Sequence, residues 1–468
     1  MPITVSLHTL GCKLNYSETS SIAKQFTEHG LTITKFGESS DVFVLNTCTV
    51  TSNADKECRQ LIRRVLRNNP ETYVIVTGCY AQLQPEEIAE IEGVDLVLGS
   101  NEKFQVFDYI ENLEKKNLSC VGSDSKVKVF ISPVDKMDDV GEAFSEDIDS
   151  RTRAFLKIQD GCDYNCSFCT IPLARGKSRS LAPEKVIENA KKIIDAGYKE
   201  IVLTGVNTGD YSYQNLREKN DKTHKLVDIL YELDKLNISR IRISSIEPNL
   251  LSDGIISITK SSDKLCNHFH IPLQSGDPEI LKLMKRRYSR ELFEELVYKL
   301  NEEIKDVGVG VDVIIGSPGE TESHFRNTFE FLESLPISYL HVFNYSERRN
   351  TRAITLSGKV GVSERKERSL ILRNLSARKK FDFYSKFIGS EQEVLFEKLK
   401  EDSKGNLIIE GFTTNYIRVT TKRISNIENS IKHAKLLKTN GVKPIDCKIV
   451  GEYSEKEKHK ESLIDQLH

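Results

Sequence analysis

Three cysteines stand close together in the stretch Cys162-Asp163-Tyr164-Asn165-Cys166-Ser167-Phe168-Cys169. Cysteine thiolates hold iron–sulfur clusters, normally four thiolates to a cluster. Three thiolates would leave one iron of a 4Fe–4S cluster open to an external ligand, as a catalytic metal centre requires. A structural zinc site or a group of unrelated buried thiols is the alternative, although zinc needs a fourth ligand and no histidine follows nearby. The spacing therefore favours a catalytic 4Fe–4S cluster.

A second set of three cysteines is spread over the first part of the chain and consists of Cys12, Cys48 and Cys79. Each follows a predicted strand by one or two residues. Because the carboxyl ends of parallel strands lie at one edge of a sheet, these thiols could converge and hold a second cluster, again one ligand short. Three unrelated small buried residues would give the same pattern. We expect the remaining four cysteines to be structural: Cys58, Cys120, Cys266 and Cys447.

Several later strands end in residues that could contact a cofactor. They are Gly205, Asn207, Glu247, Gln274 and Asp312. A glycine lets the backbone approach a ligand closely, and a carboxylate at a strand end suits a ribose hydroxyl or an ammonium group. Taken singly, each of these sites could be an ordinary turn. In a parallel barrel, however, all these strand ends would share the face where active sites lie.

The elements that position the second cysteine set alternate between strand and helix. Strands are predicted at 4–10, 41–46 and 73–77, with helices at 17–29, 54–68 and from Pro85 onward. This alternation predicts an α/β domain with a doubly wound parallel sheet over residues 1–120. Apolar periodicity fades over residues 121–150, which we interpret as a linker.

The alternation returns for residues 151–386, the segment that carries the first cysteine set. Six strands are predicted, at 154–158, 201–203, 239–244, 268–271, 311–315 and 340–343. Six strands with intervening helices predict a partial (β/α)6 barrel, followed by a charged helix at 361–386. Short strands at 393–397, 407–410 and 417–419 predict a small β-barrel over 387–453. Residues 454–468 form a charged tail.

The composition limits the classes of function. Hydrophobic residues make up 38% of the chain and charged residues 29%, which is typical of a globular protein. The net charge of −2 means that any nucleic-acid surface must be a local basic patch. We expect no export signal, no membrane span and no disulfide framework, and hence a cytoplasmic protein with reduced thiols.

The first cysteine stretch, with an aromatic residue before its last cysteine, resembles the signature of the radical-SAM superfamily. That resemblance implies that Cys162, Cys166 and Cys169 hold a 4Fe–4S cluster whose open iron is chelated by the amino and carboxylate groups of S-adenosylmethionine. One electron would then cleave that cofactor to a 5′-deoxyadenosyl radical. The strand ends described above, in their order behind the cysteines, are similar to the cofactor-binding motifs of the superfamily.

The second cysteine set resembles a more specific family. The stretches Thr9–Asn15, Asn46–Val50 and Gly78–Gln82 look like the three cysteine motifs of methylthiotransferases, and the resemblance covers nearly the whole chain. It implies a second 4Fe–4S cluster on Cys12, Cys48 and Cys79 that supplies or carries the transferred sulfur. One S-adenosylmethionine would methylate this sulfur and another would generate the radical. Ser317 departs from the family pattern, which usually has phenylalanine there, and this leaves the local cofactor contact open.

The tail and two short stretches indicate the substrate. Residues 389–397 and 411–419 are similar to the TRAM domain, a small RNA-binding barrel, with Tyr416 and Arg418 as candidate RNA contacts. Tyr416 could equally pack in the barrel core. The stretches Thr9–Asn15 and Thr170–Gly176 look most like the MtaB-like subfamily. The resemblance implies transfer of a methylthio group to C2 of N6-threonylcarbamoyladenosine at position 37 of tRNA, in the anticodon loop.

That substrate carries a carboxylate, so a basic recognition group is expected, and we suggest Arg287 or Arg349. Arg287 belongs to a basic run at 285–287 that follows the glutamine–serine–glycine loop at 274–276. Arg349 belongs to the run of Arg348, Arg349 and Arg352 that follows the last predicted barrel strand, and each run could instead be a solvated surface. The expected partners are tRNA and an electron donor such as flavodoxin or ferredoxin, with no DNA and no membrane. The sulfur donor is undetermined.

Other functions stay open at this point. The same reaction could act on isopentenyl-adenosine in tRNA or on an aspartate of a small-subunit ribosomal protein. A non-catalytic RNA-binding protein with structural clusters is disfavoured because structural metal sites are usually closed. A sulfur-inserting enzyme for a small metabolite would have no use for the RNA-binding tail.

Overall fold

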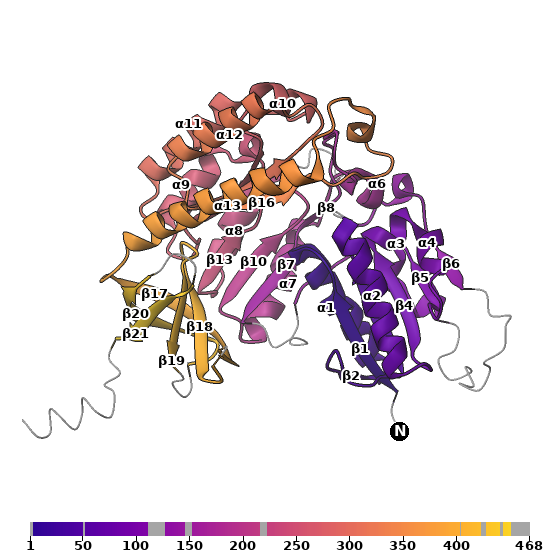
Figure 1. Ribbon diagram of the computed structural model, residues 1–468. Helices are drawn as coiled ribbons and strands as arrows, with labels where there is room; N and C mark the ends of the chain where they lie inside the picture. Colours follow the sequence, from indigo (N-terminus) through magenta and orange to yellow (C-terminus); the bar gives the residue numbers. More distant parts are fainter. Residues whose placement is uncertain are drawn as a thin grey trace, which may run out of the picture. The chain divides into compact units, whose positions relative to one another are not determined.

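The computed structural model describes residues 3–49, 52–110, 127–145, 152–215, 222–402, 404–422, 427–439 and 443–450. Cys120 and the charged tail at 454–468 lie outside these ranges, as does much of the predicted linker. The chain divides into two compact units, Met1–Leu375 and Ser376–His468, and the division falls within helix α13 (Val362–Ser385). Figure 1 labels many of the helices and strands of both units. Among the described residues, no helix has the length and apolar character needed to cross a membrane.

The first unit begins with a six-stranded sheet in the order β2-β1-β3-β4-β5-β6, whose neighbouring strands are all parallel. Its strands are β1 (Thr4–Thr9), β2 (Thr32–Thr34), β3 (Val42–Thr47), β4 (Tyr73–Gly78), β5 (Leu96–Leu98) and β6 (Lys128–Phe130). Its helices are α1 (Lys13–Glu28), α2 (Ser52–Asn68), α3 (Cys79–Leu83), α4 (Pro85–Ala89) and α5 (Val106–Tyr109), with 3-10 turns η1 (Glu102–Gln105) and η2 (Val134–Lys136).

Helices cover both faces of this sheet. Phe26 of α1 packs on one face against Val5 and Val44, and Ile62 of α2 packs on the other face against Phe43. Successive residues of a strand point to opposite faces, so a continuous apolar run such as that of β3 can bury both faces at once. The predicted doubly wound parallel sheet is confirmed.

Part of the segment 121–150, which we interpret as a linker, pairs with the N-terminal sheet. Strand β6 extends the sheet by pairing with β5 through Leu96↔Lys128, Val97↔Val129 and Leu98↔Phe130. Further along, Phe144 is buried and bridges Leu156. The uncovered edge of a strand presents unpaired backbone N–H and C=O groups. A short run of β-branched and aromatic residues can pair with these groups as an added strand, even where the surrounding sequence is polar. The boundaries proposed for the domains stay predictions.

The second part of this unit is built on six parallel strands in two sheets, β13-β10-β7 and β14-β15-β16. The strands are β7 (Arg153–Lys157), β10 (Glu200–Thr204), β13 (Arg240–Ile243), β14 (His268–Gln274), β15 (Gly308–Ile315) and β16 (Tyr339–Asn344). The parallel bridges Ile241↔Leu265 and Ser245↔His270 connect the two sheets. The strands therefore follow one another in chain order, as predicted for a partial barrel.

Helices and short elements join these strands. The helices are α6 (Ile171–Arg175), α7 (Pro183–Asp195), α8 (Leu226–Asp234), α9 (Asp253–Ser261), α10 (Pro278–Leu283), α11 (Arg290–Glu303) and α12 (Glu322–Ser334). The short elements are β8 (Gln159–Asp160), β9 (Arg179–Ser180), β11 (Ser212–Tyr213), β12 (His224–Lys225), η3 (Thr208–Asp210), η4 (Pro248–Leu250) and η5 (Arg352–Thr355).

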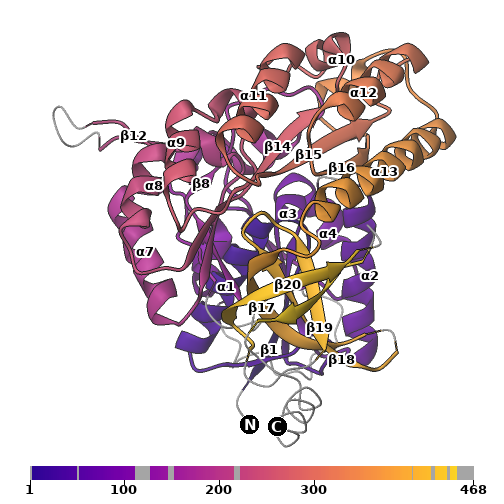
Figure 2. The ribbon, with the colours of Figure 1, turned by 90° about the vertical axis from the view of Figure 1, so that its left-hand side faces the viewer.

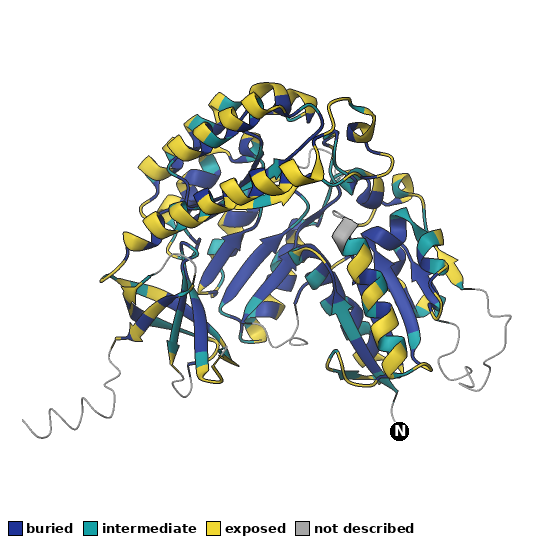
Figure 3. Cartoon of the chain, in the orientation of Figure 1, coloured by how far each residue is buried: buried dark blue, intermediate teal, exposed yellow. Residues whose placement is uncertain are grey.

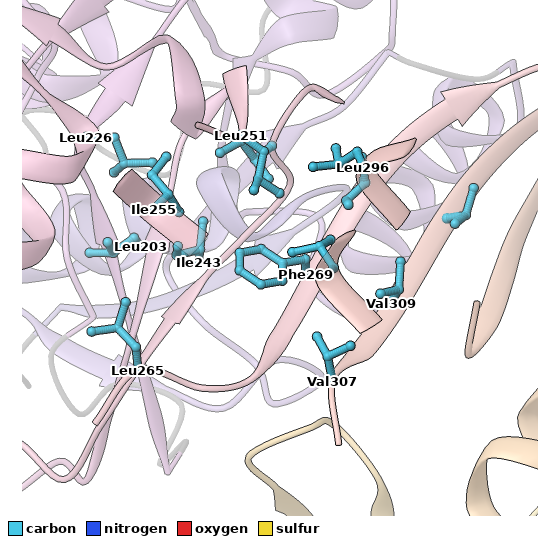
Figure 4. Close-up of a cluster of buried hydrophobic side chains, with 14 of the residues drawn as sticks. Leu203, Leu226, Ile243, Leu251, Ile255, Leu265, Phe269, Leu296, Val307 and Val309 are labelled. Carbon is cyan, nitrogen blue, oxygen red and sulfur yellow. The ribbon is translucent and has the colours of Figure 1, made fainter. Parts of the chain in front are cut away.

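The main core lies between the partial barrel and its helices. Phe269 of β14, Val309 of β15 and Leu296 of α11 belong to one cluster of buried side chains (Figure 4). Figure 3 shows the barrel strands as buried and the outer sides of the helices as exposed. Because side chains alternate along a strand, His270 and Asp312 occupy the opposite face of β14 and β15. The hydrophobic pattern thus assigns one strand face to the core and leaves the other for chemistry.

The second unit contains a closed five-stranded barrel in the order β17-β18-β19-β21-β20 (Figure 2). Its strands are β17 (Glu391–Glu401), β18 (Leu407–Thr413), β19 (Arg418–Lys422), β20 (Ser430–Lys438) and β21 (Ile445–Ile449). Val394, Ile409, Val419 and Ala434 fill its interior. The predicted small β-barrel is confirmed. Strands β20 and β21 were not anticipated, because their few buried apolar residues stand among lysines.

Candidate active site

The first cysteine set lies in the loop that follows β8. The backbone N–H of Tyr164 donates to Cys162 Sγ at 3.4 Å, and the N–H of Ile171 donates to Cys169 Sγ at 3.5 Å. The Cys169 N–H donates to the Cys166 carbonyl at 3.2 Å, which folds the three thiols into one loop. Burial, together with the neighbouring thiols, raises the pKa of Cys162 to about 11 and that of Cys169 to about 12. Such thiols release protons when they bind a metal.

Arg286 connects this loop to a strand end. Its Nη1 donates to Cys166 Sγ at 3.0 Å, and its Nη2 forms a buried ion pair with Glu247. Burial raises the pKa of Glu247 although Arg286 opposes the shift. The sequence reasoning missed Arg286. The signal was the basic run at 285–287, in which only Arg287 was selected.

Three of the candidate cofactor residues lie together near the cysteine loop. Gln159 Oε1 accepts the Asn207 N–H at 3.0 Å, and Asn207 Oδ1 accepts the Glu247 N–H at 3.5 Å. A Cβ on Gly205 would lie 2.8 Å from Gln159 Oε1, so a larger residue there would displace the Gln159 side chain. Gly205, Asn207 and Glu247 therefore converge, and their contact with a cofactor stays a prediction.

Gln274 ends β14 in the left-handed region, with φ of 69°, and its Oε1 is buried without a hydrogen-bond partner among the described residues. Asp312 has partners that the sequence reasoning missed: His270 Nε2 at 2.7 Å and His341 Nδ1 at 3.3 Å. Burial by itself would raise the pKa of Asp312, but hydrogen bonds from both imidazoles lower it well below its usual range. The sequence signal that could have revealed this cluster is a polar residue on the non-core face of each of three adjacent strands.

The second cysteine set also converges. A Cβ on Gly11 would lie 2.7 Å from Cys48 Sγ, so the turn before Cys12 passes directly over Cys48. Asn15 Oδ1 lies 3.8 Å from Cys12 Sγ and accepts from Arg175 Nη2 at 2.7 Å. Arg175 in turn donates through Nε to Cys79 Sγ at 3.3 Å. Cys12 is exposed, whereas Cys48 and Cys79 are buried.

Arg175 belongs to a buried ionic network between the N-terminal sheet domain and the partial barrel. Its guanidinium contacts Glu18 at 2.8 Å and Asp160 at 2.9 Å. Glu18 also pairs with Lys103 at 2.6 Å and with Lys157 at 3.0 Å. Although burial would raise the pKa of Asp160, Arg175 and Lys157 lower it well below its usual range. These three cations and two carboxylates leave a cationic surplus, and a buried charge needs a counter-charge. An anionic thiolate-bound cluster on Cys79 fits this donor set.

Helix α6 connects the two cysteine sets. At its first residue, the Ile171 N–H contacts Cys169 Sγ, and at its last residue the Arg175 side chain contacts Cys79 Sγ. One turn of helix therefore carries hydrogen-bond donors to a ligand of each predicted cluster. This arrangement fixes the two sets relative to each other.

The two arginines suggested for substrate recognition lie in different settings. Arg287 is exposed and its guanidinium lies over the Tyr164 ring, 4.1 Å from the centroid, beside the first cysteine set. The Arg349 side chain is 73% exposed and pairs with Glu87 of α4 at 2.6 Å. In the barrel of the second unit, Tyr416 stacks on Phe412 with ring centroids 4.9 Å apart, and Arg418 donates to Glu410 Oε2 at 2.7 Å.

The cysteines expected to be structural are buried where the structure describes them. Cys58 belongs to the core beneath α2 and Cys447 to the core of the small barrel, and Cys266 is also buried. Ser317, which departs from the family pattern, is buried, and its Oγ has no hydrogen-bond partner among the described residues.

Known proteins share both the motifs and the fold. Residues 156–332 match the Radical SAM superfamily, and residues 4–99 match Uncharacterized protein family UPF0004. The chain is 41% identical to the threonylcarbamoyladenosine tRNA methylthiotransferase MtaB of Bacillus subtilis, over 93% of this chain and 94% of that protein. The chain belongs to the MtaB family of methylthiotransferases. An MtaB relative from Aquifex aeolicus is 39% identical over 84% of this chain and 92% of its own length.

More distant proteins share the sequence or the fold of this chain. A tRNA-2-methylthio-N(6)-dimethylallyladenosine synthase from Endomicrobium trichonymphae is 30% identical over 92% of this chain and 97% of its length. The solved structure of the radical S-adenosylmethionine methyltransferase TsrM from Kitasatospora setae superposes with a TM-score of 0.51 at 15% identity, covering 74% of this chain and 75% of that one. As a radical-SAM member of the MtaB family, the chain uses S-adenosylmethionine and 4Fe–4S clusters.

Proposed function

We propose that this chain transfers a methylthio group to C2 of N6-threonylcarbamoyladenosine at position 37 of tRNA. The observation that carries this proposal is the pairing of two three-thiol sets by helix α6, one set bonded through Ile171 and the other through Arg175. Each set would hold a 4Fe–4S cluster with three thiolates, which would leave one iron for a non-protein ligand. The MtaB relatives, at 39% and 41% identity over most of their length, support the substrate.

The residues of the chain would divide the work between the two sets. Cys162, Cys166 and Cys169 would hold the cluster that binds S-adenosylmethionine, and Cys12, Cys48 and Cys79 would hold the second cluster. When bound, these groups supply the radical that removes hydrogen from the base, together with the sulfur and its methyl group.

The surrounding residues orient the reactants. The Glu247–Arg286 pair orders the strand end beside Cys166, and we assign it with Gly205, Asn207, Gln274 and Asp312 to the cofactor. Arg175 holds the second set against α6. Burial of most of these groups excludes water from the reacting centre, which suits radical chemistry.

The proposed partners follow from this chemistry. The substrate is the anticodon loop of tRNA, where unstacked bases are accessible. Tyr416 and Arg418 of the small barrel are the proposed RNA contacts, supported by the Phe412–Tyr416 stack. We assign the electron to a donor such as flavodoxin or ferredoxin and the protein to the cytoplasm, where tRNA is modified.

Mass spectrometry of tRNA nucleosides from cells that lack this gene tests the proposal. We expect the 2-methylthio form of threonylcarbamoyladenosine to disappear and its unmethylthiolated precursor to accumulate. Re-expression of the chain should restore it, and re-expression with Cys166→Ala should not. Persistence of the modified nucleoside would overturn the substrate assignment.

A second candidate function is the same reaction on isopentenyl-adenosine. It is supported by the 30% identity to the dimethylallyladenosine synthase named above, which is lower than that to the two MtaB relatives. Loss of the methylthio form of isopentenyl-adenosine alone in the same experiment would favour it. No change in either nucleoside would direct attention to the ribosomal protein.

A further inference from the structure

The segment after β16 lies against the loops of both cysteine sets. At its end, the Ala353 N–H donates to the carbonyl of Ser167 at 2.8 Å, inside the first cysteine stretch. Near its middle, Arg348 Nη1 pairs with Asp55 Oδ2 at 2.5 Å. Asp55 Oδ1 accepts from the hydroxyl of Thr49, the residue after Cys48, at 3.3 Å. Arg348 therefore lies between the loops that would hold the two clusters.

A tight turn fixes the backbone of Arg348. The Arg348 carbonyl accepts the Thr351 hydroxyl at 2.7 Å and the Thr351 N–H at 3.3 Å. Asn350, inside this turn, has a φ of 63°, in the left-handed region that asparagine tolerates. The position of Arg348 is thus set by the turn as well as by its ion pair with Asp55.

The guanidinium of Arg348 has donors that the protein does not use. The residue is only 9% exposed, and its Nε and Nη2 atoms are buried without a hydrogen-bond partner among the described residues. A buried donor without an acceptor is costly, and for a charged group the cost is higher. Nε–H and Nη2–H project side by side from one edge of the guanidinium. This edge matches the two oxygens of a carboxylate or a phosphate.

We propose that the Nε–Nη2 edge of Arg348 binds an oxyanion of the substrate tRNA at the place where the target base enters between the two cysteine sets. This inference rests on the function proposed above. The oxyanion has two possible sources in that substrate: the carboxylate of the threonylcarbamoyl group and a backbone phosphate beside the target nucleotide. Both present two oxygens to one guanidinium edge, so the chemistry of recognition is shared.

Arg348 differs from its neighbour Arg349 in every relevant respect. Arg349 is largely exposed, and its guanidinium contacts Glu87 at 2.6 Å and Gln84 Oε1 at 3.1 Å. Arg348 faces inward, and Asp55 uses only one of its three nitrogens. Of the arginine pair that the sequence offers, the structure assigns substrate recognition to Arg348.

Equilibrium binding of anticodon stem-loops to the reconstituted full-length protein tests this assignment. Two probes are needed, one with threonylcarbamoyladenosine and one with unmodified adenosine at the target position. The test variants are Arg348→Gln, which removes the charge, and Arg348→Lys, which keeps the charge but loses the bidentate edge. The matched controls are Asp55→Asn, which breaks the same ion pair without altering the edge, and Arg349→Gln, which removes the exposed neighbour.

If the threonyl carboxylate is the ligand, Arg348→Gln should weaken binding of the modified stem-loop by about 10- to 100-fold, as expected for a lost charge-assisted pair. Binding of the unmodified probe should then be unchanged. If a phosphate is the ligand, the affinity for both probes should fall equally. The slope of log affinity against log salt concentration should then decrease in magnitude by about one, as expected for the loss of one phosphate contact. Arg348→Lys should recover only part of the affinity in either case.

Three outcomes would overturn the inference. Unchanged binding of both probes by Arg348→Gln would show that the edge contacts no substrate. An equal loss in Asp55→Asn would show that Arg348 only fastens its loop to α2. If Arg348→Gln fails to load iron, Arg348→Lys becomes the test variant. Wild-type affinity of Arg348→Lys for the stem-loops would contradict recognition by the bidentate edge. Wild-type protein that binds the modified stem-loop but cannot methylthiolate it would instead contradict the proposed function.

Discussion

Arg175 Nε lies 3.3 Å from Cys79 Sγ and joins the last residue of α6 to the first residue of α3. Arg175 is 1% exposed, so this contact between the partial barrel and the N-terminal sheet domain is shielded from solvent. Hydrogen bonds to ligand sulfurs and the net charge around a cluster are two of the factors that set its reduction potential. The contact therefore connects the architecture of the interface to the electronic properties of the second cluster.

We expect Arg175→Gln to shift the midpoint potential of the second cluster to a more negative value. The reduced cluster carries more negative charge, so it is destabilised more than the oxidised cluster when a cationic donor is lost. The loss of one hydrogen bond should destabilise the reduced cluster by on the order of 1 kcal/mol. Redox titration followed by electron paramagnetic resonance measures this shift, in protein whose first set is removed by alanine at Cys162, Cys166 and Cys169.

Lys103→Met is the control for that experiment, because Lys103 belongs to the same network but its Nζ pairs with Glu18 rather than with a cysteine sulfur of the described residues. The midpoint potential of the second cluster should shift less in Lys103→Met than in Arg175→Gln. Equal shifts in the two variants would mean that only the summed charge of the network acts. Arg175→Lys should keep the charge and give an intermediate potential.

Gly11→Ala should impair loading of the second cluster selectively. Gly11 has a φ of 101°, and an added Cβ would lie 2.5 Å from Cys48 Cβ and 2.7 Å from Cys48 Sγ. Iron content per protein should fall to about half, while the signal of the first cluster persists, because each cluster would hold four irons. Gly30→Ala is the matched control, since Gly30 also has a positive φ but open space around it. Full iron content in Gly11→Ala would contradict convergence of Cys12 and Cys48 at one cluster.

Glu200→Gln should destabilise the partial barrel in a pH-dependent way. Glu200 on β10 and Arg242 on β13 form a buried ion pair at 2.8 Å. Burial by itself would raise the pKa of Glu200, but Arg242 prevails and lowers it. Removal of one partner from a buried pair costs about 3–5 kcal/mol of unfolding free energy at neutral pH.

The sign of this pH dependence follows from the lowered pKa. The ionised carboxylate contributes its stability fully above the unfolded pKa of about 4.3 and loses it as pH falls toward the lower folded pKa. Denaturant unfolding from pH 7 to pH 3 should show the difference between wild type and variant narrowing below about pH 4. A constant difference over this range would contradict a linked ionisation of Glu200.

Tyr416→Ala should weaken tRNA binding while the small barrel stays folded. Tyr416 is only partly buried and stacks on Phe412, which together offer an aromatic platform. A base stacked on such a side chain contributes about 1–3 kcal/mol, so affinity should fall at least fivefold. Filter binding measures the affinity and circular dichroism measures the fold. The control variant Leu407→Ala changes an exposed apolar residue of β18 and should bind tRNA normally. Unchanged affinity in Tyr416→Ala would exclude this face as an RNA contact.

Much of the fold could be predicted from the sequence because its signals are local. The apolar runs of β3 and β4, each bounded by a helix, identify a parallel sheet without knowledge of its neighbours. The three thiols between Cys162 and Cys169 are close in the chain and must be close in space. Strand β6 could not be predicted because it is defined by its pairing with the edge of β5. A pairing partner that is distant in sequence leaves no local pattern in the residues of the strand itself.

The amino-acid sequence by itself determined the residue types at both cysteine sets, the order of strands and helices, and the family resemblance. Only the tertiary structure decided how these parts meet. It brought Arg175 to Cys79 across 96 positions and Arg348 to Asp55 across 293. It also distinguished Arg348 from Arg349, which local sequence cannot do. The turn closed by Thr351 and the packing of the domains decide which of two adjacent side chains points inward, and such long-range packing is not encoded in neighbouring residues.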